Sequence, residues 1–507
     1  MKEINKNENE NENDIKELLY SFQRNEYKET IDIARKIIKD FPDNHLATKA
    51  LASSLFHVGD LNNALAEINK TIKIAPNDYQ AYNICGNIFK EKNNLNEAKN
   101  CYENAIKLNI NYHIAWNNLG LIFNELNDYP KAFKCFKKAI KIKPNYFSAI
   151  FNVGNLYRKI NRPHDALHYY KKAELIEPNN FNLLNCMGVI SKELGQLENS
   201  GNYYTKALKY NPEFAEAHNN LGNLYNEIGD FKNATFSFNR AISINKNSAV
   251  FHENLGHAYL KNKQITHAVS CYENALILNP NNDYIKHLLS ALIGENLPRA
   301  NNVYVEKMFD QYAQNFEYSL VKKLNYETPK LLVENLNRYV NPNLKKYDIL
   351  DLGCGTGLSG LAVKHLSQSL VGVDLSEKML AKAKEKSIYS KLIKSEISEF
   401  LSQSLNDCFN IIISVDVFVY IGELQEIFQR VFNILQINGF FAFSVEALIA
   451  SDNNKYKLNQ NGRYAHSKEY INNLVNIFDF KILDFKMDQI RLEDNFPVMG
   501  YIYVLQK

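Results

Sequence analysis

The segment Asp348-Ile-Leu-Asp-Leu-Gly-Cys-Gly-Thr-Gly-Leu-Ser-Gly360 joins an apolar run to three glycines at alternate positions, Gly353, Gly355 and Gly357. The apolar run predicts a buried parallel strand over 347–352, and residues 358–366 predict a helix. Glycine reaches positive φ without a Cβ clash, and the N–H groups at a helix start can face a ligand. The segment therefore predicts a strand-to-helix turn on which a ligand binds.

The residues around this turn indicate which class of ligand it binds. A second strand, 370–374, ends in Asp374 at the spacing expected of an acceptor for ribose hydroxyls. The glycine spacing differs from that of a dinucleotide fingerprint. The pattern Asp-x-Gly-x-Gly-x-Gly resembles motif I of class I methyltransferases, which bind S-adenosylmethionine (SAM). The resemblance implies SAM contacts from Asp351, Gly353, Cys354, Gly355, Gly357, Asp374, Leu375, Met379, Glu396 and Tyr312.

Length and composition indicate a globular protein of more than one domain. At 507 residues the chain is too long for one core, and 45% hydrophobic residues suffice for globular folding. A net charge of +3 gives no electrostatic case for binding nucleic acid or acidic membranes. The seven cysteines form no C-x-x-C pair, and no apolar run approaches a membrane span. These features predict a reduced, cytoplasmic protein without a metal site or membrane insertion.

A period of 34 residues runs through the N-terminal part. Glycines recur at this spacing from Gly86 to Gly256, and Ala, Pro and aromatic positions keep the same period. The pattern resembles the tetratricopeptide repeat (TPR), a helix-turn-helix unit of 34 residues. Trp116-Asn-Asn-Leu-Gly120 belongs to the clearest unit. We expect an all-α TPR solenoid over 11–293, with about eight repeats and a capping helix at 283–293, after a disordered tail at 1–10.

The first helices of the repeats carry rows of asparagine. In O-GlcNAc-transferase-like TPR arrays a similar ladder holds an extended peptide by its backbone. The resemblance therefore implies a groove that binds a protein or peptide partner. Asparagine is also common at these TPR positions and throughout this chain, which leaves a purely structural role open. The expected groove residues are Asn87, Asn118, Asn152, Asn155, Asn220, Asn223 and Asn254.

A linker and a helical segment separate the repeats from the glycine turn. Residues 294–300 predict the linker, and 301–345 predict amphipathic helices around Phe309-Asp-Gln-Tyr-Ala-Gln-Asn-Phe316. Segments of this type precede motif I in bacterial TPR-methyltransferase fusions that are distantly related to trans-aconitate-type methyltransferases. There they form a lid over the cofactor. The resemblance implies a lid here, and plain packing on the catalytic domain is the alternative.

Residues 346–507 are expected to form an α/β, Rossmann-like domain. Apolar runs at 391–394, 409–415, 439–445, 481–487 and 498–505 predict further strands. The resemblance implies a seven-stranded, mostly parallel sheet whose last strand is antiparallel, with SAM beyond the carboxyl ends of the strands. Glu396 stands where the family more often has Asp against the adenine amino group. Asp416 and Tyr420 match the family's motif IV region.

A polar loop, Gly462-Arg-Tyr-Ala-His-Ser467, follows the fifth strand. Class I methyltransferases place substrate-binding elements here. Arg463 is a candidate clamp for a carboxylate, and His466 or Asp416 is a candidate base for an amine or hydroxyl acceptor. The alternative is a helix start capped by Ser467, with Arg463 in a surface ion pair. Further candidates for the substrate pocket are Tyr420, Tyr464 and Arg491.

Three functions stay open from the sequence. The favoured one is a SAM-dependent methyltransferase whose TPR array recruits a protein partner or substrate. The second is a SAM-binding TPR scaffold without turnover. The third is an NAD-dependent oxidoreductase, which the glycine spacing disfavours. The methyl acceptor is left open among a protein, a small acid and a saccharide.

Overall fold

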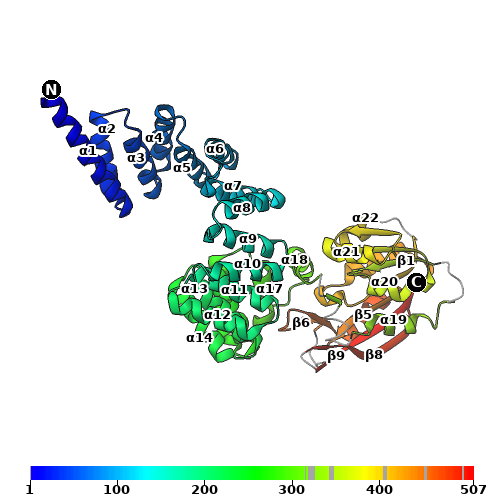
Figure 1. Ribbon diagram of the computed structural model, residues 1–507. Coiled ribbons are helices and arrows are strands. Elements are labelled where there is room, and N and C mark those ends of the chain that lie inside the picture. The colour runs from blue at the N-terminus through cyan, green and yellow to red at the C-terminus, as the bar shows by residue number, and fades with distance from the viewer. Residues whose placement is uncertain are drawn as a thin grey trace. The chain divides into compact units, whose positions relative to one another are not determined.

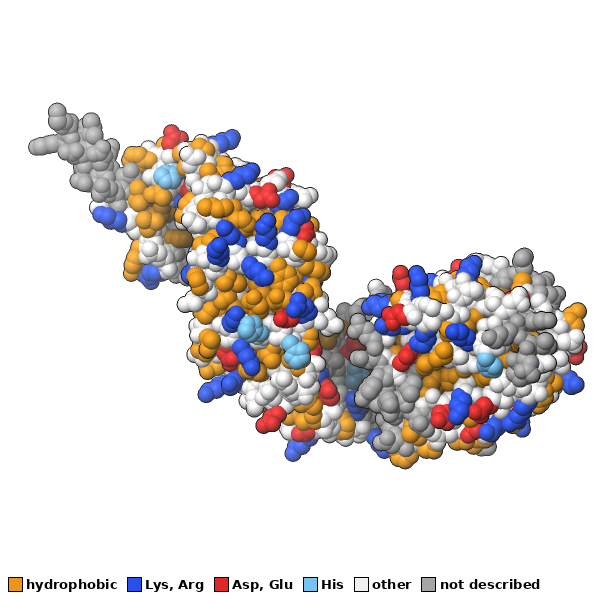
Figure 2. Space-filling view, turned by 45° about the vertical axis from the view of Figure 1, so that its right-hand side comes forward, with side chains coloured by type: hydrophobic (Ala, Val, Ile, Leu, Met, Phe, Trp, Pro, Cys, Tyr) orange, Lys and Arg blue, Asp and Glu red, His pale blue; other side chains and the backbone are white. Residues whose placement is uncertain are grey.

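The computed structural model describes residues 2–313, 316–317, 326–341, 347–403, 408–449, 454–493 and 496–507. The chain divides into two compact units, 1–244 and 245–507. Within the described ranges, every helix is too short or too polar to cross a membrane. On the solenoid face shown in Figure 2, Lys and Arg side chains are interspersed with hydrophobic ones.

The first unit consists of helices that pair as antiparallel hairpins and stack along the chain (Figure 1). These helices confirm the predicted TPR solenoid. They are α1 (Lys2–Gln23), α2 (Tyr27–Asp40), α3 (His45–His57), α4 (Leu61–Ile74), α5 (Tyr79–Glu91), α6 (Leu95–Leu108), α7 (His113–Glu125), α8 (Tyr129–Ile142), α9 (Phe147–Lys159), α10 (Pro163–Glu174), α11 (Phe181–Glu193), α12 (Leu197–Tyr210), α13 (Ala215–Glu227) and α14 (Phe231–Ile244).

Helix α1 begins at Lys2, so the backbone of residues 2–10 is helical where the sequence predicts a disordered tail. Lys and Glu are good helix formers, and this helix continues without a break to Gln23. Its later turns pack on the first repeat through Leu18, which is fully buried. A polar composition alone therefore does not end the helix.

Each repeat glycine lies against the aromatic ring of its own second helix. A Cβ built on Gly188 would be 2.5 Å from a ring carbon of Tyr204, and equivalent positions on the other repeats are equally tight. Tyr204 also shares a buried cluster with Leu221 and Leu224 of the next repeat, so the ring fills the gap between neighbouring units as well. Glycine at this position lets the two helices of a hairpin approach closely around the ring.

We expect Gly188→Ala to lower the free energy of unfolding by about 1–3 kcal/mol, because the buried ring of Tyr204 cannot move aside. Gly201→Ala, in α12 of the same repeat, is the matched control. Its Cβ meets only a methyl of Leu224 at 3.3 Å, and alanine gains up to about 1 kcal/mol of helix propensity. Urea unfolding measures both variants. Equal stability of the two would contradict the packing argument.

The second unit opens with three further repeat helices, α15 (Ala249–Lys261), α16 (Ile265–Leu278) and α17 (Asp283–Ile293). Helix α17 has the bounds predicted for the capping helix and ends at Gly294, whose φ is 77°. The segment predicted as a linker is hydrogen-bonded to residues 420–423. The carbonyl of Pro298 accepts the N–H groups of Gly422 and Glu423, and the N–H of Ala300 donates to Tyr420, each at 2.9 Å. The domain boundary at 294–300 stays a prediction.

The α/β part is a nine-stranded sheet between two layers of helices. Its strands are β1 (Tyr347–Leu352), β2 (Ser367–Asp374), β3 (Lys391–Lys394), β4 (Phe409–Ser414), β5 (Leu435–Ala447), β6 (Tyr456–Leu458), β7 (Tyr464–His466), β8 (Lys481–Glu493) and β9 (Phe496–Gln506). Its helices are α18 (Asn302–Tyr312), α19 (Thr328–Leu336), α20 (Leu358–Val363), η2 (Lys364–Leu366), α21 (Glu377–Glu385), α22 (Ile397–Gln403), η3 (Phe418–Tyr420), α23 (Gln425–Ile434) and α24 (Lys468–Ile477).

The strand order explains where the sheet can bind a ligand. Strands run β3-β2-β1-β4-β5 in parallel, and β9 pairs antiparallel to β5 and to β8. The order reverses between β1 and β4, which is the switch point where such sheets bind ligands. The mostly parallel sheet and its antiparallel last strand are confirmed. The predicted count of seven is exceeded because the loop after β5 folds into the short hairpin β6–β7.

Candidate functional site

A cavity lies beyond the carboxyl ends of β1, β2 and β4, as the switch point predicts. Residues from the glycine turn, from the ends of β2 and β4 and from the helical segment before β1 surround it. Eleven of the predicted site residues line it: Gly353, Cys354, Gly355, Asp374, Leu375, Met379, Glu396, Asp416, Tyr420, Arg463 and Arg491.

The glycine turn adopts the backbone that its sequence requires. Gly353, Gly355 and Gly357 have φ values of 69°, 52° and 90°. A Cβ at Gly353 would collide with a methyl group of Val417, which follows β4. A Cβ at Gly355 would meet no atom within 4 Å, although the residue lines the cavity. The turn thus leaves bare backbone facing open space at Gly355.

Asp374 ends β2 with its carboxylate at the cavity. Its Oδ2 accepts the N–H of Gly355 at 2.9 Å, and its Oδ1 accepts the N–H of Ser376 at 2.8 Å. Burial raises the pKa of Asp374, and these two N–H groups oppose the rise. Each carboxylate oxygen can accept more than one hydrogen bond, so both keep capacity for a hydroxyl.

Asp351 lies beneath the turn rather than in the cavity wall. It is fully buried, and its Oδ2 accepts hydrogen bonds from the hydroxyls of Ser359 and Tyr389, each at 2.7 Å. Burial raises the pKa of Asp351 to about 6, and the two hydroxyls limit the rise. Its hydrogen bonds tie β1 to α20 and to the segment before β3, which fixes the turn from below. Gly357 also lies outside the lining.

Helix α18 lies over the start of α21, beside Asp374. The hydroxyl of Ser376, which caps α21, donates to Asp310 Oδ1 at 2.5 Å. Phe309 lines the cavity, with its ring 5.4 Å from that of Tyr420 and 5.8 Å from that of Phe316. The helical segment thus supplies an aromatic wall. The predicted SAM contact Tyr312 has its side chain outside the described part of the chain.

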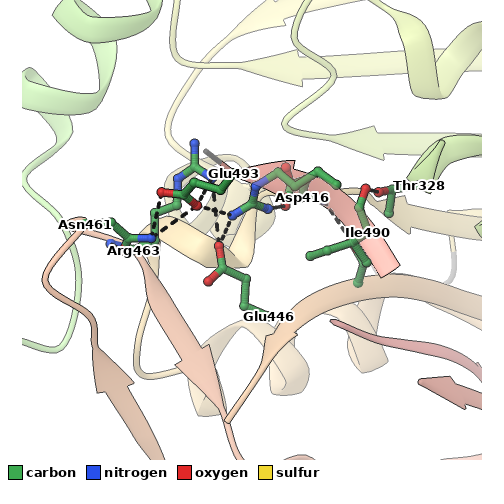
Figure 3. Close-up of polar contacts among 9 residues, drawn as sticks. Thr328, Asp416, Glu446, Asn461, Arg463, Ile490 and Glu493 are labelled. Carbon is green, nitrogen blue, oxygen red and sulfur yellow. Dashed lines mark hydrogen bonds and ion pairs between the residues drawn. The ribbon is translucent and has the colours of Figure 1, made fainter. Parts of the chain in front are cut away.

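An ionic cluster, drawn in Figure 3, reaches the cavity through Asp416, Arg463 and Arg491. The side chain of Arg491 is 1% exposed, and it donates hydrogen bonds to Asp416, at 2.8 Å, and to Glu446. Arg463 stands near Glu493 and Glu446, with nitrogen–oxygen distances of 3.6 and 3.9 Å. Two guanidinium groups therefore face three carboxylates.

Two features of this cluster bear on its chemistry. Asp416 has a φ of 58°, which is strained for a residue with a side chain and occurs often at functional sites. Within the described residues, the guanidinium of Arg463 makes its ion pairs without a hydrogen bond shorter than 3.5 Å. Its donors are therefore available to a ligand, whereas those of Arg491 are largely used by Asp416 and Glu446.

The structure does not bring His466 or Tyr464 to the cavity. Both are fully buried in strand β7. Nε2 of His466 donates toward the carbonyls of Ile421 and Gly422, at 3.0 and 3.1 Å. Burial lowers the pKa of His466 to about 4, so the ring is neutral at pH 7. His466 thus holds the segment after η3 in place.

This burial predicts a pH effect on stability. The pKa of His466 is about 4 in the folded state and near 6.5 in the unfolded state, so the unfolded chain binds the extra proton between these values. Stability therefore falls as pH drops through this window, by roughly 3 kcal/mol in total. We expect His466→Gln to lose less stability between pH 7 and pH 4 than the unaltered chain, by urea unfolding. Equal losses would contradict the assignment.

The sequence missed two charged residues of the site. Arg299 lines the cavity and pairs with Glu396 at 3.3 Å, and it donates to Ser398 at 3.0 Å. Glu446 lies in β5, directly after the mostly apolar run 440–445 and before Ala447. A lone carboxylate in a buried strand was the available signal, because such a group needs a charged partner.

The asparagine rows take part in hydrogen bonds between and within repeats. Asn118 donates to Asn83 at 3.0 Å, Asn152 to Asn117 at 2.9 Å and Asn220 to Asn185 at 2.9 Å. Asn87 and Asn155 accept the hydroxyls of Tyr102 and Tyr170, at 2.8 and 2.7 Å. These bonds support a structural role for the rows. Peptide binding by Asn223, Asn254 and the others stays a prediction.

Among the described residues, no group of three or more His, Cys, Asp and Glu side chains is arranged to hold a metal ion.

Comparisons with known proteins agree with both parts of the fold. Residues 343–484 match a methyltransferase domain model, and tetratricopeptide repeat models match 86–125, 113–146, 147–180, 190–229, 215–248 and 249–282. The chain is 24% identical over 132 residues to the ubiquinone biosynthesis O-methyltransferase of Rickettsia akari (strain Hartford), covering 25% of this chain and 51% of that one.

Two further similarities are to a curated protein and to a solved structure. The chain is 26% identical over 168 residues to the probable S-adenosylmethionine-dependent methyltransferase CRG1 of Saccharomyces cerevisiae (strain ATCC 204508 / S288c), covering 32% of this chain and 57% of that one. The crystal structure of the APC/C hetero-tetramer Cut9-Hcn1 aligns with a TM-score of 0.45 at 19% identity, over 55% of each chain.

The chain spans about half the length of the curated relatives it matches. The trans-aconitate-type subtype stays a prediction. The matched models and the two folds together identify the chain as a fusion of tetratricopeptide repeats with a methyltransferase domain.

Proposed function

We propose that the cavity binds SAM and that the chain is an active class I methyltransferase whose repeats recruit a protein partner or substrate. The observation that carries this proposal is the carboxylate of Asp374 at the cavity, held by the N–H groups of Gly355 and Ser376. A rigid acceptor at the end of β2 suits the two hydroxyls of a ribose.

The neighbouring residues fit the rest of the cofactor. Gly355 leaves open space where any side chain would intrude, which suits the close approach of a ligand to backbone. Leu375 and Met379 offer apolar contact beside Asp374, and Met379 is 1% exposed. Glu396 follows β3 and lines the cavity, where it can accept from an amino group. Its ion pair with Arg299 holds the carboxylate in one orientation.

SAM supplies a methyl group on a sulfonium, which is already electrophilic. The residues of this chain then have to hold a nucleophile in line and exclude water. Phe309, Phe316 and Tyr420 give the cavity an apolar side that limits water. We assign to Arg463 the binding of an acceptor oxygen, because its guanidinium lines the cavity with donors available.

Arg463→Ala is expected to lower acceptor-dependent methyl transfer by tenfold or more while SAM affinity stays within about twofold, because a charge-assisted hydrogen bond contributes about 1.5–3 kcal/mol. Arg463→Lys should restore little, since a planar fork becomes a point charge. Transfer of tritium from labelled SAM into a cell extract measures the loss, and calorimetry measures SAM affinity. Full methyl transfer by Arg463→Ala would contradict this assignment and show that the acceptor binds elsewhere.

Titration calorimetry with SAM and with NAD on the full chain tests the cofactor assignment. We expect saturable binding of SAM at a one-to-one ratio and none of NAD. Binding of NAD alone would favour an oxidoreductase and overturn the proposal. Binding of SAM without release of S-adenosylhomocysteine under any acceptor supply would favour a SAM-binding scaffold.

A further inference from the structure

The hairpin β6–β7 carries Arg463 but is only lightly attached to the sheet. Strand β7 pairs with β5 through two residue pairs, Glu446 with Ala465 and Ala447 with His466. Arg463 lies in the turn just before β7, where the N–H of Asn459 donates to its carbonyl at 2.8 Å. The position of this guanidinium therefore depends on what else holds the turn.

The capping helix α17 holds the turn directly. Nε2 of His287 donates to the carbonyl of Gly462 at 2.8 Å, next to Arg463. The His287 ring is 2% exposed, and its centroid is 5.1 Å from that of Tyr304 and 6.1 Å from that of Tyr464. A Cβ at Gly462 would lie 3.5 Å from the same ring, so the turn and the helix are in close contact.

The hydrogen bond defines the state of the histidine. Because a carbonyl only accepts, Nε2 must carry the proton. Nδ1 is buried without a hydrogen-bond partner in the described part of the chain, and burial lowers the pKa of His287. The ring is therefore a neutral donor with one defined tautomer, which suits a fixed structural contact.

A second residue braces the same hairpin. The amide of Asn296, three residues beyond α17, donates to the carbonyl of Tyr456 and accepts the N–H of Leu458, each at 2.8 Å. This side chain pairs with the edge of β6 as a neighbouring strand would. Ala291, Ala300, Tyr304, Leu458 and Tyr464 form one buried apolar cluster between the helix and the hairpin.

We infer that α17 is part of the catalytic unit and that His287 is a positioning residue, which holds the Gly462 turn so that Arg463 faces the cavity. The inference rests on the proposed role of Arg463 in binding the acceptor. The end of the repeat array thereby shapes the acceptor side of the cavity, while the SAM side depends on the glycine turn and Asp374.

Hydrogen exchange on the full chain tests the contact without any ligand. His287→Phe keeps an aromatic ring but removes the donor, and His287→Gln places an amide donor near Nε2. We expect amides of 459–464 to exchange about tenfold faster in His287→Phe and close to the parental rate in His287→Gln. Amides of 349–357 should not change in either variant. Parental exchange at 459–464 in His287→Phe would overturn the inference.

A double-variant comparison connects the contact to function. If His287 acts through Arg463, His287→Phe should lower transfer of tritium from labelled SAM into a cell extract, and should cost nothing further in an Arg463→Ala background. Additive losses would overturn the positioning role. SAM affinity should stay within about twofold in all these variants. Absence of SAM binding by the parental chain would instead contradict the proposed function and leave the exchange result standing.

Nitrogen-15 spectra of labelled histidine provide a further test at pH 7. They should include slowly exchanging Nε2 protons on two neutral, buried rings, those of His287 and His466, and His287→Gln should remove only the His287 signal. A rapidly exchanging or charged ring at this position at pH 7 would overturn the inference.

Discussion

Replacing Arg491 with leucine is expected to destabilise the catalytic domain by about 3–5 kcal/mol, because removing one partner of a buried ion pair leaves its carboxylates uncompensated. The Arg491 side chain is 1% exposed and is bonded to Asp416 and Glu446. Burial already raises the pKa of Glu446, and Arg491 is the strongest group opposing this rise. Urea unfolding of the full chain measures the effect.

Arg430→Leu is the matched control for this variant. Arg430 pairs with Glu426 on α23 at 2.7 Å, but both side chains are partly exposed, so the pair contributes at most about 1 kcal/mol. A second change separates charge from packing. Combining Arg491→Leu with Glu446→Gln should recover part of the lost stability, because one uncompensated charge is removed. A loss of less than 1 kcal/mol in Arg491→Leu would contradict the account of the ionic cluster.

Replacing Asp374 with alanine is expected to weaken SAM binding by tenfold or more, which corresponds to roughly 1.5–3 kcal/mol for lost charge-assisted hydrogen bonds. The carboxylate is held toward the cavity by two backbone N–H groups. Asp374→Asn should lose less affinity for SAM, since one acceptor oxygen remains. Calorimetry with SAM measures each affinity.

Asp348→Ala is the control for this second prediction. Asp348 lies in the same motif and is also acidic, but it stands at the start of β1 and outside the cavity lining. We expect its SAM affinity to match that of the parental chain. Unchanged affinity in Asp374→Ala would remove the observation on which the cofactor assignment rests.

The parts of the fold that depend on local sequence were predictable. Strand β1 has the predicted bounds, and the three glycines have the positive φ that a tight turn requires and that glycine adopts without strain. The bounds of α17 were predicted because the repeat period places the final helix. Asp374 could be predicted to lie at the cavity because it ends β2, and parallel strands bring their carboxyl ends to one edge of the sheet.

The parts that depend on distant contacts were not predictable. His466 and Arg463 are neighbours in sequence, yet the structure buries His466 in β7 and places Arg463 at the cavity. The pairing of β7 with β5 decides which side chain faces the cavity. The sequence does not show this, because a strand of three residues is too short to display an alternation of apolar and polar side chains. The partner of Gly462 is 175 residues away in sequence, on α17. No local pattern identifies such a contact.

The most direct test of the proposed activity is the formation of S-adenosylhomocysteine from SAM by the full chain, with a size-fractionated cell extract as the source of acceptor. The account predicts that at least one fraction stimulates product formation, that the rate saturates with SAM, and that Asp374→Ala lowers the rate at a limiting SAM concentration. A parental chain that binds SAM but forms no S-adenosylhomocysteine with any fraction would contradict the claim that the domain is an active methyltransferase.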